Sequence, residues 1–233
     1  MATEKIVLAI FDFDGTLTTG HLWKGLAAFH NTRRIKRTVI YGYILKNIVP
    51  WLAAKIKLYP KDKNLISWGT GLAKLVKGFT EAEVKETFEW VADNYFQPLL
   101  RQDMLEVMQQ HRRQGHRIML LSGSFFEFLE IMAKKLEMEF VVGTSLEKRD
   151  GLYTGKIVPP LCFAENKANY LLGFTRHNSL NVDFNQSYVY ADSIYDSALF
   201  RLVGHPVAVY PDQALFTQAQ RQGWSIIGEA KGK

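Results

Sequence analysis

Two carboxylates, Asp12 and Asp14, stand two residues apart at the end of an apolar run from Ile6 to Phe11. Side chains two apart in a β-strand share a face, so both acids can meet where the strand passes into its loop. Carboxylates held together repel each other unless a cation lies between them or one binds a proton. The spacing therefore suits a divalent cation such as Mg²⁺, or a nucleophile paired with an acid. Alone, it is equally typical of an ordinary Asp-Gly turn.

Further polar groups lie between a predicted strand and the next predicted helix, or at the start of a predicted helix. They are Ser122-Gly123 after Arg117 to Leu121, Lys167 in a helix from Glu165, and Asp192 with Asp196 after Tyr188 to Tyr190. Ligands of parallel α/β sheets bind at the carboxyl ends of the strands. Asp12, Ser122 and Asp192 are therefore predicted to lie at one edge of the sheet. Taken singly, Ser122 could be a helix cap, Lys167 a surface lysine, and the two acids helix-capping groups.

Four segments resemble, in the same order, the motifs of the haloacid dehalogenase superfamily of phosphohydrolases. They are Asp12-Phe13-Asp14-Gly15-Thr16, Leu121-Ser122-Gly123, Lys167, and Ala191-Asp192-Ser193-Ile194-Tyr195-Asp196. The resemblance covers nearly the whole chain. The long stretch between the first two motifs is similar to the helical cap of the phosphoserine-phosphatase-like branch.

The resemblance implies a role for each motif residue. Asp12 is the expected nucleophile, which forms an aspartyl-phosphate, and Asp14 is the expected general acid and base. The expected phosphate-binding residues are Gly15 and Thr16 through loop N–H groups, Ser122, Gly123 and Lys167. The expected Mg²⁺ ligands are Asp12, Asp14 through its backbone carbonyl, Asp192 and Asp196.

The residues after the first motif depart from the phosphoserine phosphatase pattern. Those enzymes carry a glutamate there that binds the substrate amine, whereas this chain has Gly20 and His21. An imidazole cannot replace a carboxylate in binding an ammonium group, so phosphoserine is not the predicted substrate. His21 is a candidate substrate contact or a structural residue at a helix start. Ala191 and Tyr195 stand where glycine and asparagine are usual.

Alternating strands and helices predict an α/β fold, with a Rossmann-like, mostly parallel sheet flanked by helices. Residues 1–18 and 97–233 form the predicted catalytic core, and residues 19–96 an inserted all-helical cap domain. Within the cap, Pro50 is expected to separate two helices and Thr80 to Glu83 to form a capping box. In the core, Ser124 or a neighbour is expected to cap a helix, and Ser145 to Val158 to form a hairpin.

The net charge of +6 is concentrated in one segment. Residues 31–63 contain nine lysines and arginines and one acid, Asp62, among many aromatic and aliphatic residues. This pattern fits a solvated helix face, a surface that steers anionic substrates, or peripheral membrane contact. The single cysteine, Cys162, excludes an intrachain disulfide, and no signal-like or membrane-spanning stretch is found, so a cytoplasmic location is predicted.

The predicted function is a Mg²⁺-dependent phosphatase that acts through phospho-Asp12 on a small phosphorylated metabolite or a lipid phosphate. A phosphotransferase with the same mechanism, a phospholipid-phosphate phosphatase and a membrane-docking protein remain alternatives. A phospho-accepting receiver domain leaves no room for the helical insertion. No recognised motif supports nucleic-acid binding. The sequence leaves the oligomeric state open.

Overall fold

The computed structural model of the chain describes residues 5–55, 58 and 60–231. Six parallel strands form the central sheet in the order β3-β2-β1-β6-β7-β8. These strands are β1 (Leu8–Phe11), β2 (Arg117–Phe125), β3 (Phe140–Thr144), β6 (Tyr188–Ala191), β7 (His205–Val209) and β8 (Ser225–Ile227). The predicted α/β fold with a mostly parallel sheet is confirmed.

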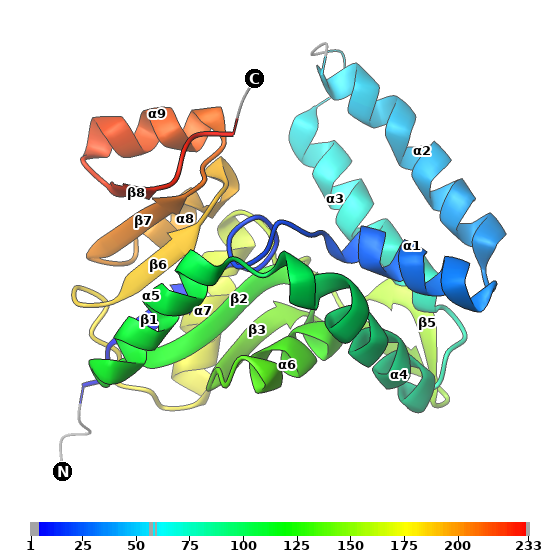
Figure 1. Cartoon of the computed structure of the whole chain (residues 1–233), viewed down its shortest axis with the longest axis horizontal. Helices are drawn as coiled ribbons and strands as arrows, with labels where there is room; N and C mark the ends of the chain where they lie inside the picture. Colours follow the sequence, from blue (N-terminus) through cyan, green and yellow to red (C-terminus); the bar gives the residue numbers. More distant parts are fainter. Residues whose placement is uncertain (1–4, 56–57, 59, 232–233) are drawn as a thin grey trace.

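Helices cover both faces of this sheet (Figure 1). Strand β1 is buried along its whole length, so its residues must be apolar on both faces. Ala9 and Phe11 pack toward one core cluster, and Leu8 and Ile10 toward the other. Helices α5 (Gln102–Arg113) and α6 (Phe126–Lys135) complete the first cluster. Helices α7 (Glu165–His177), α8 (Ser197–Phe200) and α9 (Gln213–Gln222) complete the second.

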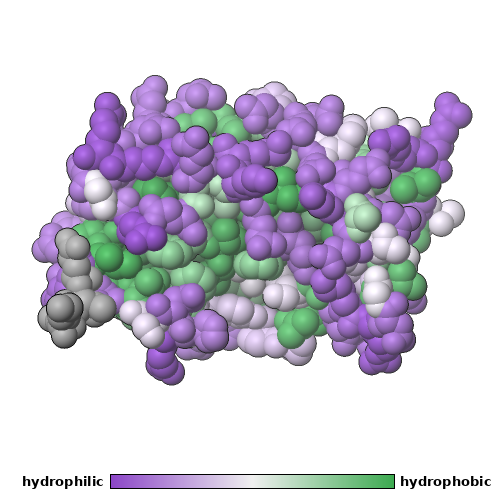
Figure 2. Space-filling view, turned by 90° about the horizontal axis from the view of Figure 1, so that it is seen from below, coloured by the Kyte–Doolittle hydropathy of each residue, from purple (hydrophilic) through white to green (hydrophobic). Residues whose placement is uncertain are grey.

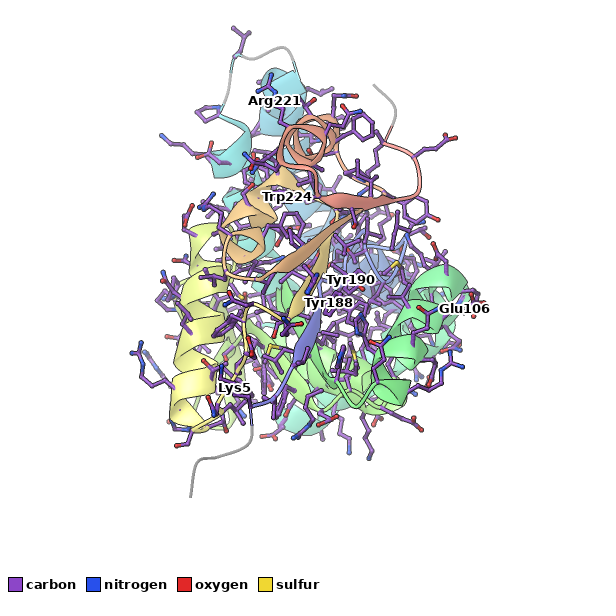
Figure 3. The ribbon with its side chains drawn as sticks, turned by 90° about the vertical axis from the view of Figure 1, so that its left-hand side faces the viewer. Lys5, Glu106, Tyr188, Tyr190, Arg221 and Trp224 are labelled. Atoms are coloured by element: carbon purple, nitrogen blue, oxygen red, sulfur yellow. The ribbon has the colours of Figure 1, made fainter. Side chains whose placement is uncertain are left out.

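Strands β6 and β1 lie between these two helical layers. The end-on view in Figure 3 shows Tyr188 and Tyr190 of β6 in the middle, Glu106 of α5 on one side and α7 on the other. From β1 the chain winds to β2 and β3 in one direction and to β6, β7 and β8 in the other. This reversal between β1 and β6 opens a crevice at the carboxyl ends of the strands, where α/β proteins bind ligands.

The segment between β1 and β2 is helical, as predicted. It contains α1 (Leu22–Arg33), α2 (Arg37–Lys55), α3 (Lys61–Leu72), a 3₁₀ turn (Ala73–Val76), α4 (Glu81–Val91), a π-helical turn (Ala92–Phe96) and a 3₁₀ turn (Gln97–Leu99). The capping box of α4 is confirmed: Thr80 accepts from the Glu83 N–H, and the Glu83 carboxylate accepts from the Thr80 N–H at 2.7 Å. Within the described residues, no helix is long and apolar enough to cross a membrane.

The two connecting segments that join the helical segment to the sheet run side by side. Thr18 and Leu100 form an antiparallel bridge, and the Arg101 N–H donates to the Leu17 carbonyl at 2.9 Å. We propose that the cap domain begins at residue 19 and ends at residue 96, because the chain leaves the core and returns to it at this junction. The predicted hairpin is confirmed as β4 (Leu146–Arg149) and β5 (Leu152–Ile157), and it packs on the base of the helical segment through a Tyr153 N–H to Phe79 carbonyl bond of 2.9 Å.

The prediction that Pro50 separates two helices is wrong, because α2 runs through it. A proline inside a helix loses one backbone hydrogen bond and crowds the preceding turn. One turn earlier, however, the Asn47 side chain accepts from Ser67 of α3 at 3.1 Å and donates to the Tyr43 carbonyl at 2.8 Å. Packing on α3 therefore outweighs the local cost of the proline. Lys57 of the basic segment lies outside the described residues, as do the side chains of Lys55 and Lys61.

Candidate active site

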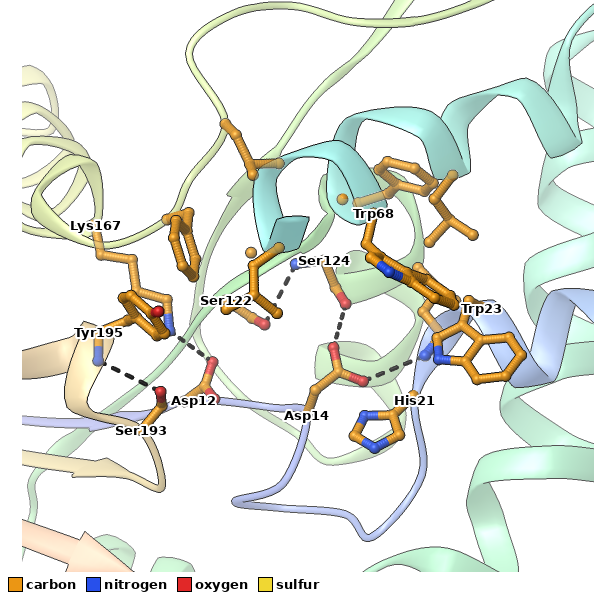
Figure 4. Close-up of a pocket in the computed structure, with 18 of the residues that line it drawn as sticks. Asp12, Asp14, His21, Trp23, Trp68, Ser122, Ser124, Lys167, Ser193 and Tyr195 are labelled. Carbon is orange, nitrogen blue, oxygen red and sulfur yellow. Dashed lines mark hydrogen bonds and ion pairs between the residues drawn. The ribbon is translucent and has the colours of Figure 1, made fainter. Parts of the chain in front are cut away.

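The carboxyl ends of β1, β2 and β6 meet beneath the helical segment, as predicted. They line a cavity of about 290 Å³ whose floor holds the sequence-predicted acids and whose upper wall comes from α1, α2 and α3 (Figure 4). The floor residues are Asp12, Asp14, Ser122, Gly123, Lys167, Asp192 and Asp196. One crevice thus gathers residues that are up to 184 positions apart in the chain, Asp12 and Asp196.

A buried lysine joins two of the acids. Lys167, in the first turn of α7, donates to Asp12 Oδ1 at 2.9 Å and to Asp196 Oδ1. Burial alone lowers the pKa of this ammonium group, but the two carboxylates raise it well above its ordinary value. The Lys167 side chain is only 6% exposed and is charged, so it offsets negative charge around Asp12. Another nearby lysine, Lys156, is exposed on β5.

Three buried carboxylates form a potential cation site. One oxygen each from Asp12, Asp192 and Asp196 lies within 4.8 Å of the others. Burial raises the pKa of Asp192 to about 6 and that of Asp196 to about 7, with repulsion from Asp12 adding to both. Clustered carboxylate oxygens are the donors that hard divalent ions bind, and a cation there would relieve this repulsion. The residues therefore fit a divalent ion.

Asp14 has different hydrogen-bond partners from these three acids. Its Oδ2 accepts from the Ser124 hydroxyl at 2.5 Å, and its Oδ1 accepts from the Leu22 N–H at 3.3 Å (Figure 4). Burial raises its pKa to about 6, although both hydrogen bonds oppose the shift. A carboxyl group of this kind can donate and accept a proton near neutral pH. Its predicted metal contact through the backbone carbonyl stays a prediction.

Ser124 is a site residue that the sequence interpretation placed elsewhere. Ser124 or a neighbour was expected to cap α6: the N-cap is the neighbour Phe125, which makes no side-chain capping bond, and Ser124 lies in the last residues of β2. The pairing of β2 with β3 is irregular between Leu121 and Phe125, and this carries Ser122 and Gly123 through the cavity wall. The expectation that the strand ends at Leu121, before Ser122, is therefore wrong, whereas Ser122 and Gly123 do precede a helix and line the cavity.

Gly15 and Thr16 shape the loop after β1. The Gly15 N–H donates to the Thr18 carbonyl at 2.9 Å and the Thr16 N–H to the Phe13 carbonyl at 3.2 Å, so the loop already uses the N–H groups expected to bind phosphate. Gly15 has φ +90°, and a Cβ there would lie 2.4 Å from Asp192 Oδ2. Only glycine fits this position, because it tolerates positive φ and the close approach of Asp192.

The wall of the cavity above these acids is largely aromatic. The Trp23 ring of α1 lies 5.3 Å from that of Trp68 of α3, and the Tyr43 hydroxyl of α2 donates to the Trp68 carbonyl at 2.9 Å. His21, the N-cap of α1, makes no side-chain capping bond and is exposed where it borders the cavity. Its position permits the predicted substrate contact, which stays a prediction.

Lys231 reaches the site from the C-terminal segment, and no motif in the sequence indicated it. Its ammonium group pairs with Asp192 Oδ2, and its backbone N–H donates to the Pro211 carbonyl at 2.8 Å. The side chain is 42% exposed, in contrast to the buried Lys167. Lys231 thus neutralises a carboxylate of the potential cation site.

The fold and the site together define an α/β enzyme with a buried carboxylate–lysine centre beneath an inserted helical cap. This arrangement agrees with the resemblance found in the motifs. The chain belongs to the haloacid dehalogenase-like hydrolase family, whose model matches residues 9–201.

Two relatives of known name align with most of the chain. It is 27% identical over 226 residues to a phosphoserine phosphatase of Mycobacterium tuberculosis, and the alignment covers 94% of this chain and 69% of the relative. It is 26% identical over 231 residues to a histidinol-phosphatase of Neisseria meningitidis, and the alignment covers 94% of this chain and 97% of the relative. The chain is accordingly a phosphoric monoester hydrolase.

Solved structures share the fold over nearly the full length. A protein of unknown function from Bordetella pertussis Tohama I aligns with a TM-score of 0.81 at 22% identity, which covers 97% of this chain and 99% of that one. A substrate-bound phosphoserine phosphatase aligns with a TM-score of 0.64 at 16% identity, which covers 96% and 93%. The predicted fold, with its inserted cap, is therefore that of the phosphoserine-phosphatase-like structures.

Proposed function

We propose that the protein is a Mg²⁺-dependent phosphatase that hydrolyses its phosphomonoester through an aspartyl-phosphate on Asp12. The single observation that carries this proposal is the different setting of the two acids of the first motif. Asp12 lies 2.9 Å from the Lys167 ammonium group and beside two further carboxylates. Asp14 instead accepts hydrogen bonds from the Ser124 hydroxyl and the Leu22 N–H, and burial raises its pKa to about 6.

In the first step, a carboxylate oxygen of Asp12 attacks phosphorus and the bond between phosphorus and the ester oxygen breaks. The leaving alkoxide takes the proton of the Asp14 carboxyl group. In the second step, the Asp14 carboxylate takes a proton from water, and the water oxygen attacks phosphorus. The bond between phosphorus and Asp12 then breaks, which releases phosphate and restores the Asp12 carboxylate.

Charge compensation accompanies both steps. Lys167 offsets the charge of Asp12 and of the phosphoryl oxygens close to it. Asp12, Asp192 and Asp196 would hold Mg²⁺, which supplies further positive charge at the phosphoryl oxygens. The roles of Ser122 and Gly123 in phosphate binding remain proposals that rest on their place in the cavity wall.

The cavity wall supports a substrate other than phosphoserine. The residues above the acids are chiefly Trp23, Tyr43, Trp68, Leu161 and Phe163, which favour an aromatic or aliphatic alcohol over a charged amino acid. His21, not a carboxylate, stands at the edge of the cavity next to α1. We propose a phosphomonoester of a small apolar or aromatic alcohol, or a lipid phosphate. The names of the relatives leave this choice open.

Hydrolysis of an aryl phosphate with and without Mg²⁺ tests the proposal in wild type and in Asp12→Asn. We expect Mg²⁺-dependent release of phosphate that the variant loses. Comparison of phosphoserine with an apolar alkyl phosphate then tests the substrate class, and the apolar ester should have the higher kcat/KM. Addition of a simple alcohol tests the phosphotransferase alternative, because transfer yields a new phosphate ester instead of free phosphate. Turnover that persists in Asp12→Asn would refute the mechanism.

A further inference from the structure

Helix α2 is apolar on two opposite faces. Its inner face packs on α3 and buries Ile40, Tyr43 and Asn47. Its outer face carries a second apolar stripe at positions i, i+4, i+7, i+8 and i+11. This outer stripe consists of Tyr41, Leu45, Ile48, Val49 and Leu52, of which Leu45 is 70% and Val49 64% exposed.

A surface helix of a globular protein normally turns charged and polar residues outward, and a helix that is apolar all round is normally buried. Here α2 lies at the outer edge of the molecule, with α3 on its inner side (Figure 1). On another face of the molecule, seen from below in Figure 2, hydrophilic side chains surround the apolar ones. A contiguous exposed apolar surface such as the outer stripe of α2 marks an interaction site.

The charge around the outer stripe identifies the kind of partner. No aspartate or glutamate occurs from residue 31 to residue 61. Arg34 is exposed at the C-cap of α1, Arg37 at the start of α2, and Lys46 flanks the stripe; Lys63 is exposed on α3, next to the exposed Asp62. Basic side chains beside an apolar helix face are attracted by anionic lipid headgroups. The partner that fits this helix has an apolar interior and a negatively charged surface.

The aromatic residues of α2 support the same choice. Tyr41 is 62% exposed within the stripe, and Trp51 is 42% exposed at its side. Tyrosine and tryptophan prefer the boundary between water and hydrocarbon, because one end of each ring system is polar. A second copy of this chain fits less well. Self-association through one shared patch would bring the basic residues of two subunits together.

We propose that the protein docks on an anionic lipid bilayer through the outer stripe of α2. Leu45, Ile48, Val49 and Leu52 enter the headgroup boundary, and the flanking arginines and lysines contact the lipid phosphates. Because Tyr43 on the inner face of α2 lines the active-site cavity, docking places this cavity next to the bilayer surface. The consequence for a lipid-phosphate substrate rests on the proposed function, whereas the docking itself does not.

Vesicle co-sedimentation tests docking with phosphatidylcholine vesicles that contain or lack phosphatidylglycerol. The test variant is Leu45→Glu combined with Val49→Glu, which puts two charges into the stripe and replaces no residue that lines the cavity. The matched control is Leu152→Glu, because Leu152 is a comparably accessible leucine, 43% exposed, at the start of β5 in the hairpin. Both proteins are also assayed for hydrolysis of a soluble aryl phosphate.

We expect wild type and Leu152→Glu to sediment with the anionic vesicles, less at high salt and less without phosphatidylglycerol. The double variant should bind at least about tenfold more weakly, with unchanged aryl phosphate hydrolysis. Failure of wild type to sediment, or equal sedimentation of the double variant, would overturn the docking proposal. A third result would also overturn it: light scattering shows that wild type is a dimer and the double variant a monomer, and neither protein binds vesicles. Retained hydrolysis in these cases would leave the proposed function standing.

Discussion

The hydrogen bond from Ser124 to Asp14 predicts a specific change in the pH profile of the enzyme. The Ser124 hydroxyl donates to Asp14 Oδ2 at 2.5 Å and so stabilises the carboxylate form, while burial raises the pKa of Asp14 to about 6. Ser124→Ala removes this donor from a buried site with little change in volume. The pKa of Asp14 should therefore rise further.

The size of this shift follows from the strength of the bond. A hydrogen bond to a charged group contributes about 1.5–3 kcal/mol, and 1.36 kcal/mol corresponds to one pKa unit. The pKa of Asp14 should therefore rise by about one to two units. Departure of an alkyl alcohol needs the protonated acid, so kcat/KM falls as pH rises through this pKa. The alkaline limb in the variant should accordingly move to higher pH.

The assay is the pH dependence of kcat/KM for a Mg²⁺-saturated enzyme with an alkyl phosphate. Ser122→Ala is the matched control: Ser122 Oγ accepts the Ser124 N–H at 3.4 Å, and among the described residues no hydrogen bond joins it to Asp14. This control should lower kcat/KM and leave the limb in place. An alkaline limb in Ser124→Ala that stays fixed, or that moves to lower pH, would refute the assignment of Asp14 as the general acid.

Three further predictions concern the charged floor of the cavity. Lys167→Met leaves buried carboxylates such as Asp12 unpaired, so the metal-free protein should lose about 3–5 kcal/mol in urea unfolding; Mg²⁺ should restore part of this stability, and a metal-independent loss would contradict the charge argument. Gly15→Ala should abolish turnover and cost about 1–3 kcal/mol, because a Cβ at φ +90° would collide with Asp192; an active, equally stable variant would show that the loop adapts. Lys231→Ala should lower the Mg²⁺ concentration for half-maximal activity about two- to fivefold, because a half-exposed cation no longer competes for Asp192; a higher requirement would mean that Lys231 supports catalysis.

The sequence predicted the parts of the site that depend on strand order. Asp12 and Asp192 each follow a buried apolar strand, and in a parallel sheet such residues reach the same edge. The position of Lys167 in the first turn of α7 was likewise readable, because helix periodicity and motif order agree there. The helical character of the insertion and the capping box of α4 followed from local patterns that tertiary contacts did not override.

The parts that the sequence did not predict depend on contacts between distant segments. Ser124 has the composition of a helix cap, and only the irregular end of β2 turns it toward Asp14. Pro50 carries a strong local signal for a helix end, which packing of α2 on α3 outweighs. Lys231 pairs with Asp192 although no motif surrounds it. The raised pKa of Asp14 also required its burial to be known.

The most direct test of the central claim is to find where the phosphoryl group goes. A single turnover is quenched in acid and digested, and the peptide that contains Asp12 and Asp14 is analysed by mass spectrometry in wild type and in Asp12→Asn. The mechanism predicts a phosphorylated peptide whose modified residue is Asp12, formed in wild type and absent from the variant. Turnover with the phosphoryl group on another residue, or on no residue at any time during the reaction, would contradict a phospho-Asp12 intermediate.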